Sequence, residues 1–133
     1  MNGTVVGDAI YNIALDTKTD WNDFYKGTVT LDNMTVPGNI FIDGHLYIIM
    51  SGTYHKIYNY TGDGCPGKLI IYGGYFAEKI NEDGGITVSA GTYELYGGKY
   101  AIRPEDSWCA SGYSVKSNTD DDSATYPYIV SAD

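Results

Sequence analysis

The side-chain types that most often catalyse reactions or bind metal ions are few and scattered in this sequence. The two histidines, His45 and His55, lie ten residues apart, without the cysteines or carboxylates of a zinc site around them. The only arginine, Arg103, precedes a proline and lies close to Glu105 and Asp106, so we expect it to form an ion pair and not to abstract a proton. These residues predict neither a metal site nor a catalytic site.

A run of three carboxylates, Asp120-Asp121-Asp122, lies near the C-terminus. Carboxylate oxygens bind calcium, but the spacing of an EF-hand loop is absent, so a solvated acidic loop is the favoured interpretation. The glycine pairs precede strands or turns and not helices, so they would not hold a nucleotide phosphate. We therefore expect no cofactor.

Two cysteines, Cys65 and Cys109, leave both a disulfide and two free thiols open. Cys65 lies in a turn-rich stretch, whereas Cys109 follows Trp108 in a more apolar one. Two free thiols are the favoured interpretation, with Cys109 as a small buried apolar residue.

Length and composition indicate one β-rich domain. The chain has 133 residues, including 17 glycines and 14 tyrosines, and is rich in Thr, Ile and Val. Its formal net charge of -9 argues against binding to nucleic acid or to an anionic membrane surface, because both require basic residues. No apolar run reaches the roughly 20 residues of a membrane-spanning helix, so we expect no membrane insertion.

A repeated segment organises the chain. The segments LYIIMSGTY (46–54), KLIIYGGYF (68–76) and TYELYGGKY (92–100) resemble one another, and TVTLDNMTV (28–36) is a weaker copy. Aligned on Leu31, Ile49, Ile71 and Leu95, they lie 18, 22 and 24 residues apart. Short strands and turns with a period in the low twenties are typical of a solenoid, in which each coil stacks on the next.

The alignment also predicts which side chains form the core. Alternation along each strand places two columns on the inner face, and a glycine-rich corner precedes a third column. The predicted core ladder consists of Leu31, Ile49, Ile71 and Leu95, with Val29, Tyr47, Leu69 and Tyr93 beside them and Val36, Tyr54, Phe76 and Tyr100 beyond the corner.

The alternate positions form an apolar stripe on a face that should meet solvent, and such a stripe usually marks a contact. The C-terminal residues Tyr126, Tyr128, Ile129 and Val130 fold back over it, or it is an oligomer or docking surface for protein, or its tyrosines stack on a glycan. All three interpretations remain open. The predicted interaction surface consists of Ile48, Met50, Ile70, Tyr72 and Tyr96.

Three regions are expected along the chain. Residues 1–18 form an N-terminal arm or edge strand, and residues 119–133 form an acidic and aromatic tail. Between them lies a β-helix domain at 19–118, which begins with a capping helix at 19–26. This helix is predicted because its aromatic residues recur at spacings of three and four and Gly27 follows it.

The end of the repeated region resembles a known family. The runs Gly97-Gly98-Lys99-Tyr100, Pro104-Glu105-Asp106 and Ala110-Ser111-Gly112-Tyr113 are similar to the ending of right-handed parallel β-helix domains in surface proteins of gut bacteria and their phages. The resemblance covers about residues 19–117. It implies a right-handed single-stranded parallel β-helix, a solenoid of about four coils, but this architecture serves lyases, adhesins and virion parts alike.

The expected function is that of a non-catalytic structural or attachment module. Lyases of this fold use clustered carboxylates for calcium and a basic residue, whereas the outward columns hold only Asp32 and Glu94, at opposite ends. The N-terminus is a poor signal peptide, which favours a phage decoration or fibre protein on a virion over a bacterial adhesin on an extracellular surface. The expected partner is a protein or another copy of the chain, with a surface glycan as the alternative.

Overall fold

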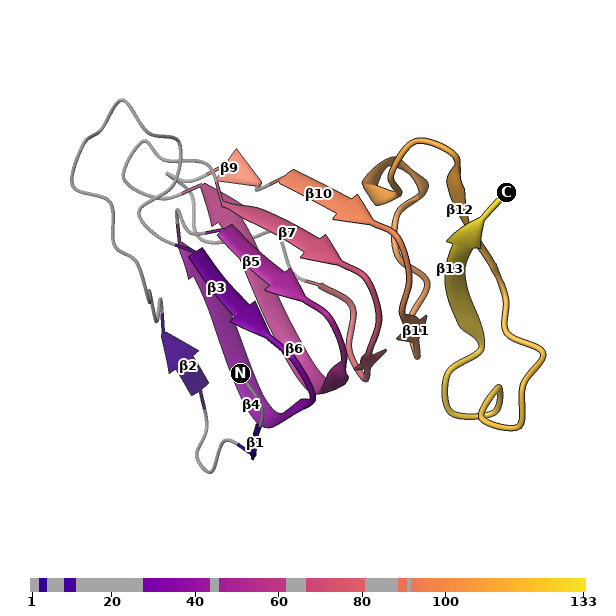
Figure 1. Ribbon diagram of the computed structural model, residues 1–133, viewed down its shortest axis with the longest axis horizontal. Coiled ribbons are helices and arrows are strands. Elements are labelled where there is room, and N and C mark those ends of the chain that lie inside the picture. Colours follow the sequence, from indigo (N-terminus) through magenta and orange to yellow (C-terminus); the bar gives the residue numbers. More distant parts are fainter. Residues whose placement is uncertain are drawn as a thin grey trace.

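The computed structural model describes residues 3–4, 9–11, 28–43, 46–61, 67–80, 89–90 and 92–133 (Figure 1). The strands are β1 (Gly3–Thr4), β2 (Ala9–Tyr11), β3 (Thr28–Leu31), β4 (Met34–Asp43), β5 (Leu46–Ile49), β6 (Gly52–Thr61), β7 (Lys68–Ile71), β8 (Tyr75–Phe76), β9 (Ser89–Ala90), β10 (Thr92–Leu95), β11 (Lys99–Tyr100), β12 (Tyr113–Ser117) and β13 (Tyr128–Ala132). One short 3-10 helix, η1, spans Asp106–Trp108. These ranges contain no helix long and apolar enough to cross a membrane. The expected mostly β structure is confirmed.

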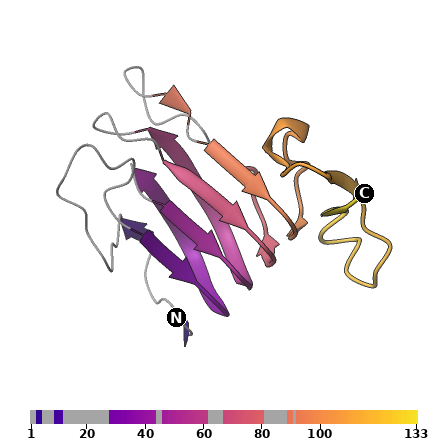
Figure 2. The same ribbon diagram turned by 45° about the horizontal axis from the view of Figure 1, so that its top comes forward.

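The strands form two sheets, and the chain alternates between them. The smaller sheet has the order β10-β7-β5-β3, and all its pairs are parallel (Figure 2). The larger sheet runs β1-β4-β6-β8-β11-β13-β12, with β2 beside β4 and β9 beside β6. Its pairs from β1 to β11 along this order are parallel, as is β2 with β4, whereas β9 pairs antiparallel with β6. The predicted parallel pairing is therefore confirmed, although no closed coil is seen within the described ranges.

Equivalent residues of the repeat face one another across the smaller sheet. Leu31 pairs with Ile49, Ile49 with Ile71, and Ile71 with Leu95. All four side chains are at most 2% exposed. The core therefore lies between the two sheets, and its inner column repeats once per strand of the smaller sheet.

The third column of the repeat forms a stack of aromatic rings in the larger sheet. The Phe76 ring lies between Tyr54, with centroids 5.5 Å apart, and Tyr100, with centroids 5.0 Å apart. The buried hydroxyls donate to corner carbonyls: Tyr54 Oη to Ser51 O at 2.6 Å and Tyr100 Oη to Gly97 O at 2.8 Å. The apolar faces of these rings are thus stacked while their polar ends are satisfied.

Each corner between the sheets contains a residue with a left-handed backbone. Gly52, Gly74 and Gly98 have φ values of 124°, 119° and 102°, which L side chains rarely adopt. A Cβ atom on Gly52 would also collide with the carbonyl oxygen of Met34 in the preceding corner. In that first corner Asn33 takes the left-handed conformation instead, with φ of 56°, and its backbone N–H donates to Ser51 Oγ at 2.8 Å.

The C-terminal residues cover the last strands of both sheets. Trp108 of η1 is buried and stacks on Tyr93 at 4.2 Å between centroids, beside β10. The tail does not fold over the apolar stripe, as one interpretation of the sequence proposed, because β13 pairs antiparallel with β11 and β12 at the end of the larger sheet.

The N-terminal expectations are only partly within the described residues. Residues 3–4 and 9–11 of the predicted arm are β1 and β2, and both pair parallel with β4. The predicted capping helix at 19–26 lies outside the described residues, as do His45 and Cys65.

Candidate interaction surface

The predicted apolar stripe lies on the outer face of the smaller sheet. Ile48 and Ile70 pair in register on neighbouring strands, and both are half-buried. Met50 and Tyr72 follow directly after these strands and are 43% and 49% exposed. The C-terminal tail therefore leaves the centre of the stripe open to solvent.

The stripe ends in a ladder of tyrosines. The Tyr72 and Tyr96 rings are stacked with centroids 5.1 Å apart and an angle of 11° between their planes. Tyr113 meets Tyr96 edge-on at 5.1 Å. One face of the Tyr72 ring is therefore covered by Tyr96.

The acidic end of the stripe is neutralised. Glu94 forms an ion pair with Lys68 and accepts a hydrogen bond from Tyr96 Oη at 2.7 Å. The hydrogen bond from Lys68, and then that from Tyr96, hold the pKa of the Glu94 carboxyl below its usual value. The same hydrogen bond raises the pKa of Tyr96, so this phenol stays protonated and remains a donor.

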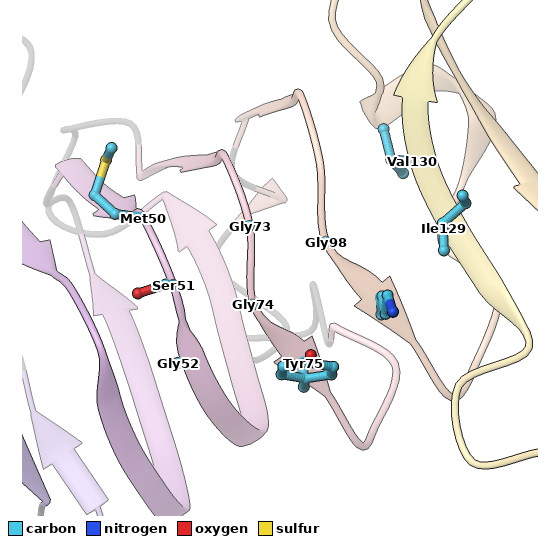
Figure 3. A pocket seen from close by; sticks show the side chains of 10 residues that line it. Met50, Ser51, Gly52, Gly73, Gly74, Tyr75, Gly98, Ile129 and Val130 are labelled. Carbon is cyan, nitrogen blue, oxygen red and sulfur yellow. The ribbon is translucent and has the colours of Figure 1, made fainter. Parts of the chain in front are cut away.

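A groove of about 410 Å³ begins at Met50 and crosses the stacked corners (Figure 3). Met50 lies on one side of it and Ile129 and Val130 of β13 lie on the other (Figure 3). Because four of the lining residues are corner glycines, much of the floor is backbone. The groove is lined by Met50, Ser51, Gly52, Gly73, Gly74, Tyr75, Gly98, Lys99, Ile129 and Val130.

Lys99 joins this groove to the acidic loop that precedes β13. Its Nζ lies 3.0 Å from both Asp120 Oδ2 and Asp122 Oδ2. The buried Asn118 amide donates to Asp122 Oδ1 at 2.8 Å. The hydrogen bonds that Asn118 and Lys99 donate to Asp122 lower the pKa of this carboxyl. The hydrogen bonds that Lys99 donates to Asp122 and Asp120 raise the pKa of Lys99 to about 12.

A second hollow, of about 420 Å³, lies on the acidic side of Lys99 and is lined by Lys99, Thr119, Asp120, Asp121 and Asp122. The predicted acidic loop is thus only partly solvated, because two of its three carboxylates form ion pairs with Lys99 of β11.

The other residues singled out for chemistry are not brought together. Arg103 pairs with Asp106 at 2.8 Å, which confirms the expected ion pair, while Glu105 pairs with Lys79 at 2.6 Å. Cys109 is a half-buried free thiol, and burial raises its pKa. Within the described ranges, no group of three His, Cys, Asp or Glu residues could hold a metal ion.

Sequence reasoning missed the groove and its far wall. The glycine pairs were a signal for a corner without side chains, but nothing local indicated that Ile129 and Val130 would come to lie beside Gly98. The backbone N–H of Val130 donates to Gly98 O at 3.2 Å, so this wall depends on the long-range pairing of β13.

A scan against protein-family models found no match for this chain, and neither did searches of curated proteins and of solved structures.

Proposed function

We propose that this chain is a right-handed single-stranded parallel β-helix that serves as a non-catalytic, surface-displayed attachment module acting through protein–protein contacts. The observation that carries the proposal is the open apolar stripe: Met50 and Tyr72 are about half exposed on a sheet whose neighbouring strands are paired in register. A regular parallel sheet holds the stripe rigid, so a partner would bind it at little cost in ordering.

The alternation of the chain between two sheets supports the solenoid part of this proposal. Four times a strand of the smaller sheet is followed by a strand of the larger one, and like residues face each other across the pairs. A stack of this kind offers long, stiff sides for contact, which is how solenoids bind their partners.

The geometry of the tyrosines favours a protein partner over a glycan. Sugars stack on free ring faces, but Tyr96 covers one face of Tyr72. A protein surface, in contrast, can bury ring edges and the flanking Met50 side chain together, with hydrogen bonds at the rim. A glycan-binding adhesin is therefore the second candidate, and a lyase the third.

The test places a photo-reactive benzoylphenylalanine at position 72 and, as a control, at position 102. Ile102 is also an exposed apolar residue, 46% exposed, but it lies outside the stripe. We expect illumination in the presence of the particles or cells that display the protein to yield a defined protein adduct from position 72 and none from position 102. Equal adducts from both positions would contradict docking through the stripe.

The alternatives give different results. A glycan adhesin would be retained on polysaccharide and released by Tyr72→Ala and Tyr96→Ala. A lyase would form unsaturated products from an acidic polysaccharide in the presence of calcium.

We also propose display on a virion, as a decoration or fibre-type protein, with an extracellular bacterial surface as the alternative. The resemblance of the repeated region to β-helix domains of gut bacteria and their phages supports this location. Capsid and tail genes beside the coding sequence are expected; a cell-wall anchor encoded there would favour the bacterial surface.

A further inference from the structure

We propose that the glycine-floored groove is an anchor pocket for an aromatic side chain of a protein partner, and that basic residues flank this side chain in the partner. The inference rests on the proposed function and extends it, because it assigns a second contact and a chemical class of partner. Met50 belongs to both the stripe and the groove, so one partner surface can cover both.

The shape of the groove suits a flat apolar group. Its walls include the side chains of Met50, Tyr75, Ile129 and Val130, while glycine backbone and the small Ser51 side chain lie between them (Figure 3). A volume of about 410 Å³ leaves room for one large side chain against these walls. Interfaces gain most of their free energy where an aromatic anchor fills such a pocket.

Glycines at the corners leave this groove open. Gly74 and Gly98 need left-handed backbone conformations, and a Cβ atom on Gly98 would come within 2.8 Å of Tyr100 Oη. The stacked corners therefore require glycine at these two positions, which contribute only backbone to the groove. An open, rigid groove results from the same contacts that hold the coils together, and a preformed pocket costs little free energy on binding.

The charge around the groove indicates which residues flank the aromatic side chain in the partner. The groove lining includes the cationic side chain of Lys99, which forms ion pairs with Asp120 and Asp122. The neighbouring Asp121 is exposed. Three carboxylates against one ammonium leave this end of the groove negative. Basic residues next to the aromatic side chain would be attracted, whereas a second copy of a chain with net charge -9 would be repelled.

The test uses the isotopically labelled full chain and three capped tripeptides, Lys-Trp-Lys, Lys-Ala-Lys and Glu-Trp-Glu, in NMR titrations. We expect Lys-Trp-Lys to shift the backbone amides of Gly73, Gly74 and Gly98 in a saturable manner. Lys-Ala-Lys lacks the ring and Glu-Trp-Glu reverses the charge, so each should bind at least tenfold more weakly. Equal affinity of Lys-Ala-Lys or of Glu-Trp-Glu, or no shift with Lys-Trp-Lys, would overturn the proposal.

Variants separate the groove from the stripe. Ile129→Thr trims one wall and keeps a β-branched residue in β13, so it should weaken Lys-Trp-Lys at least fivefold; Ile102→Thr is the matched control with no expected effect. Amide signals of β3, β5 and β7 that stay unshifted would show that the variant is folded. If position 72 forms its protein adduct but Lys-Trp-Lys does not bind, the groove assignment is wrong and the stripe stands. If Lys-Trp-Lys binds as expected but position 72 forms no adduct, the stripe is rejected and the groove assignment stands.

Discussion

Replacing Phe76 by alanine tests whether the stacked rings of the larger sheet stabilise the fold. Phe76 is 1% exposed and lies between Tyr54 and Tyr100, at 5.5 Å and 5.0 Å between ring centroids. Removing a buried aromatic ring costs about 3–5 kcal/mol because of the lost transfer free energy and the cavity left behind. Each stacked pair adds about 0.5–1.5 kcal/mol, so we expect a loss near the upper end, about 4–5 kcal/mol.

Urea denaturation followed by circular dichroism measures this loss as a change in the free energy of unfolding. Phe76→Leu keeps most of the volume without the ring, so it should cost about 2 kcal/mol and separate stacking from cavity formation. Tyr75→Ala alters the adjacent residue, which lies outside the ring stack and is 38% exposed, and should cost about 1 kcal/mol or less. If Phe76→Ala cost no more than Tyr75→Ala, the ring stack would not be part of the core.

Three further outcomes are expected. The pKa of the Asp122 carboxyl is lowered in the folded chain, so its contribution to stability is present above the ordinary pKa of 3.8 and is lost as the pH falls through the lower folded pKa. Asp122→Asn should therefore flatten the acid denaturation curve in that range. An unchanged curve would contradict the contacts of Asp122 with Asn118 and Lys99. Burial raises the pKa of Tyr54 to about 12 and that of Tyr100 further, so the folded chain keeps protons that the unfolded chain releases near pH 10. The stability of the fold should therefore fall between about pH 10 and 12. Ultraviolet titration should show these two phenols ionising only when the chain unfolds. Gly98→Ala should lower the melting temperature more than Gly112→Ala, because both glycines have positive φ but only the Cβ atom at Gly98 would meet other atoms. Equal losses in melting temperature would contradict the close packing of the corner at Gly98.

The sequence predicted the repeating part of the fold because its signals are local. Alternation within each strand and the glycine pairs recur at a regular spacing, and the aligned residues Leu31, Ile49, Ile71 and Leu95 are the ones that face each other in the sheet. The left-handed Gly74 and Gly98 lie at the predicted corners, although in the first corner Asn33 takes this conformation one position earlier.

The non-repeating part could not be predicted in the same way. The position of β13 depends on antiparallel pairing with β12 and on the contact of Lys99 with the acidic loop, and neither has a periodic signal. The apolar tail residues could equally cover the stripe or an exposed strand edge, and composition does not choose between these. The structure places them on the edge, beside β11.

Methyl NOE spectroscopy tests the stacking of coils most directly, because the inner column consists of methyl-bearing residues. In-register stacking predicts cross-peaks between Leu31 and Ile49, Ile49 and Ile71, and Ile71 and Leu95, since paired strands lie about 4.8 Å apart. It also predicts no cross-peak between Leu31 and Leu95, which lie three strand spacings apart, about 14 Å. A direct Leu31 to Leu95 cross-peak, or the absence of the three sequential ones, would contradict the stacked coils and the rigid docking surface built on them.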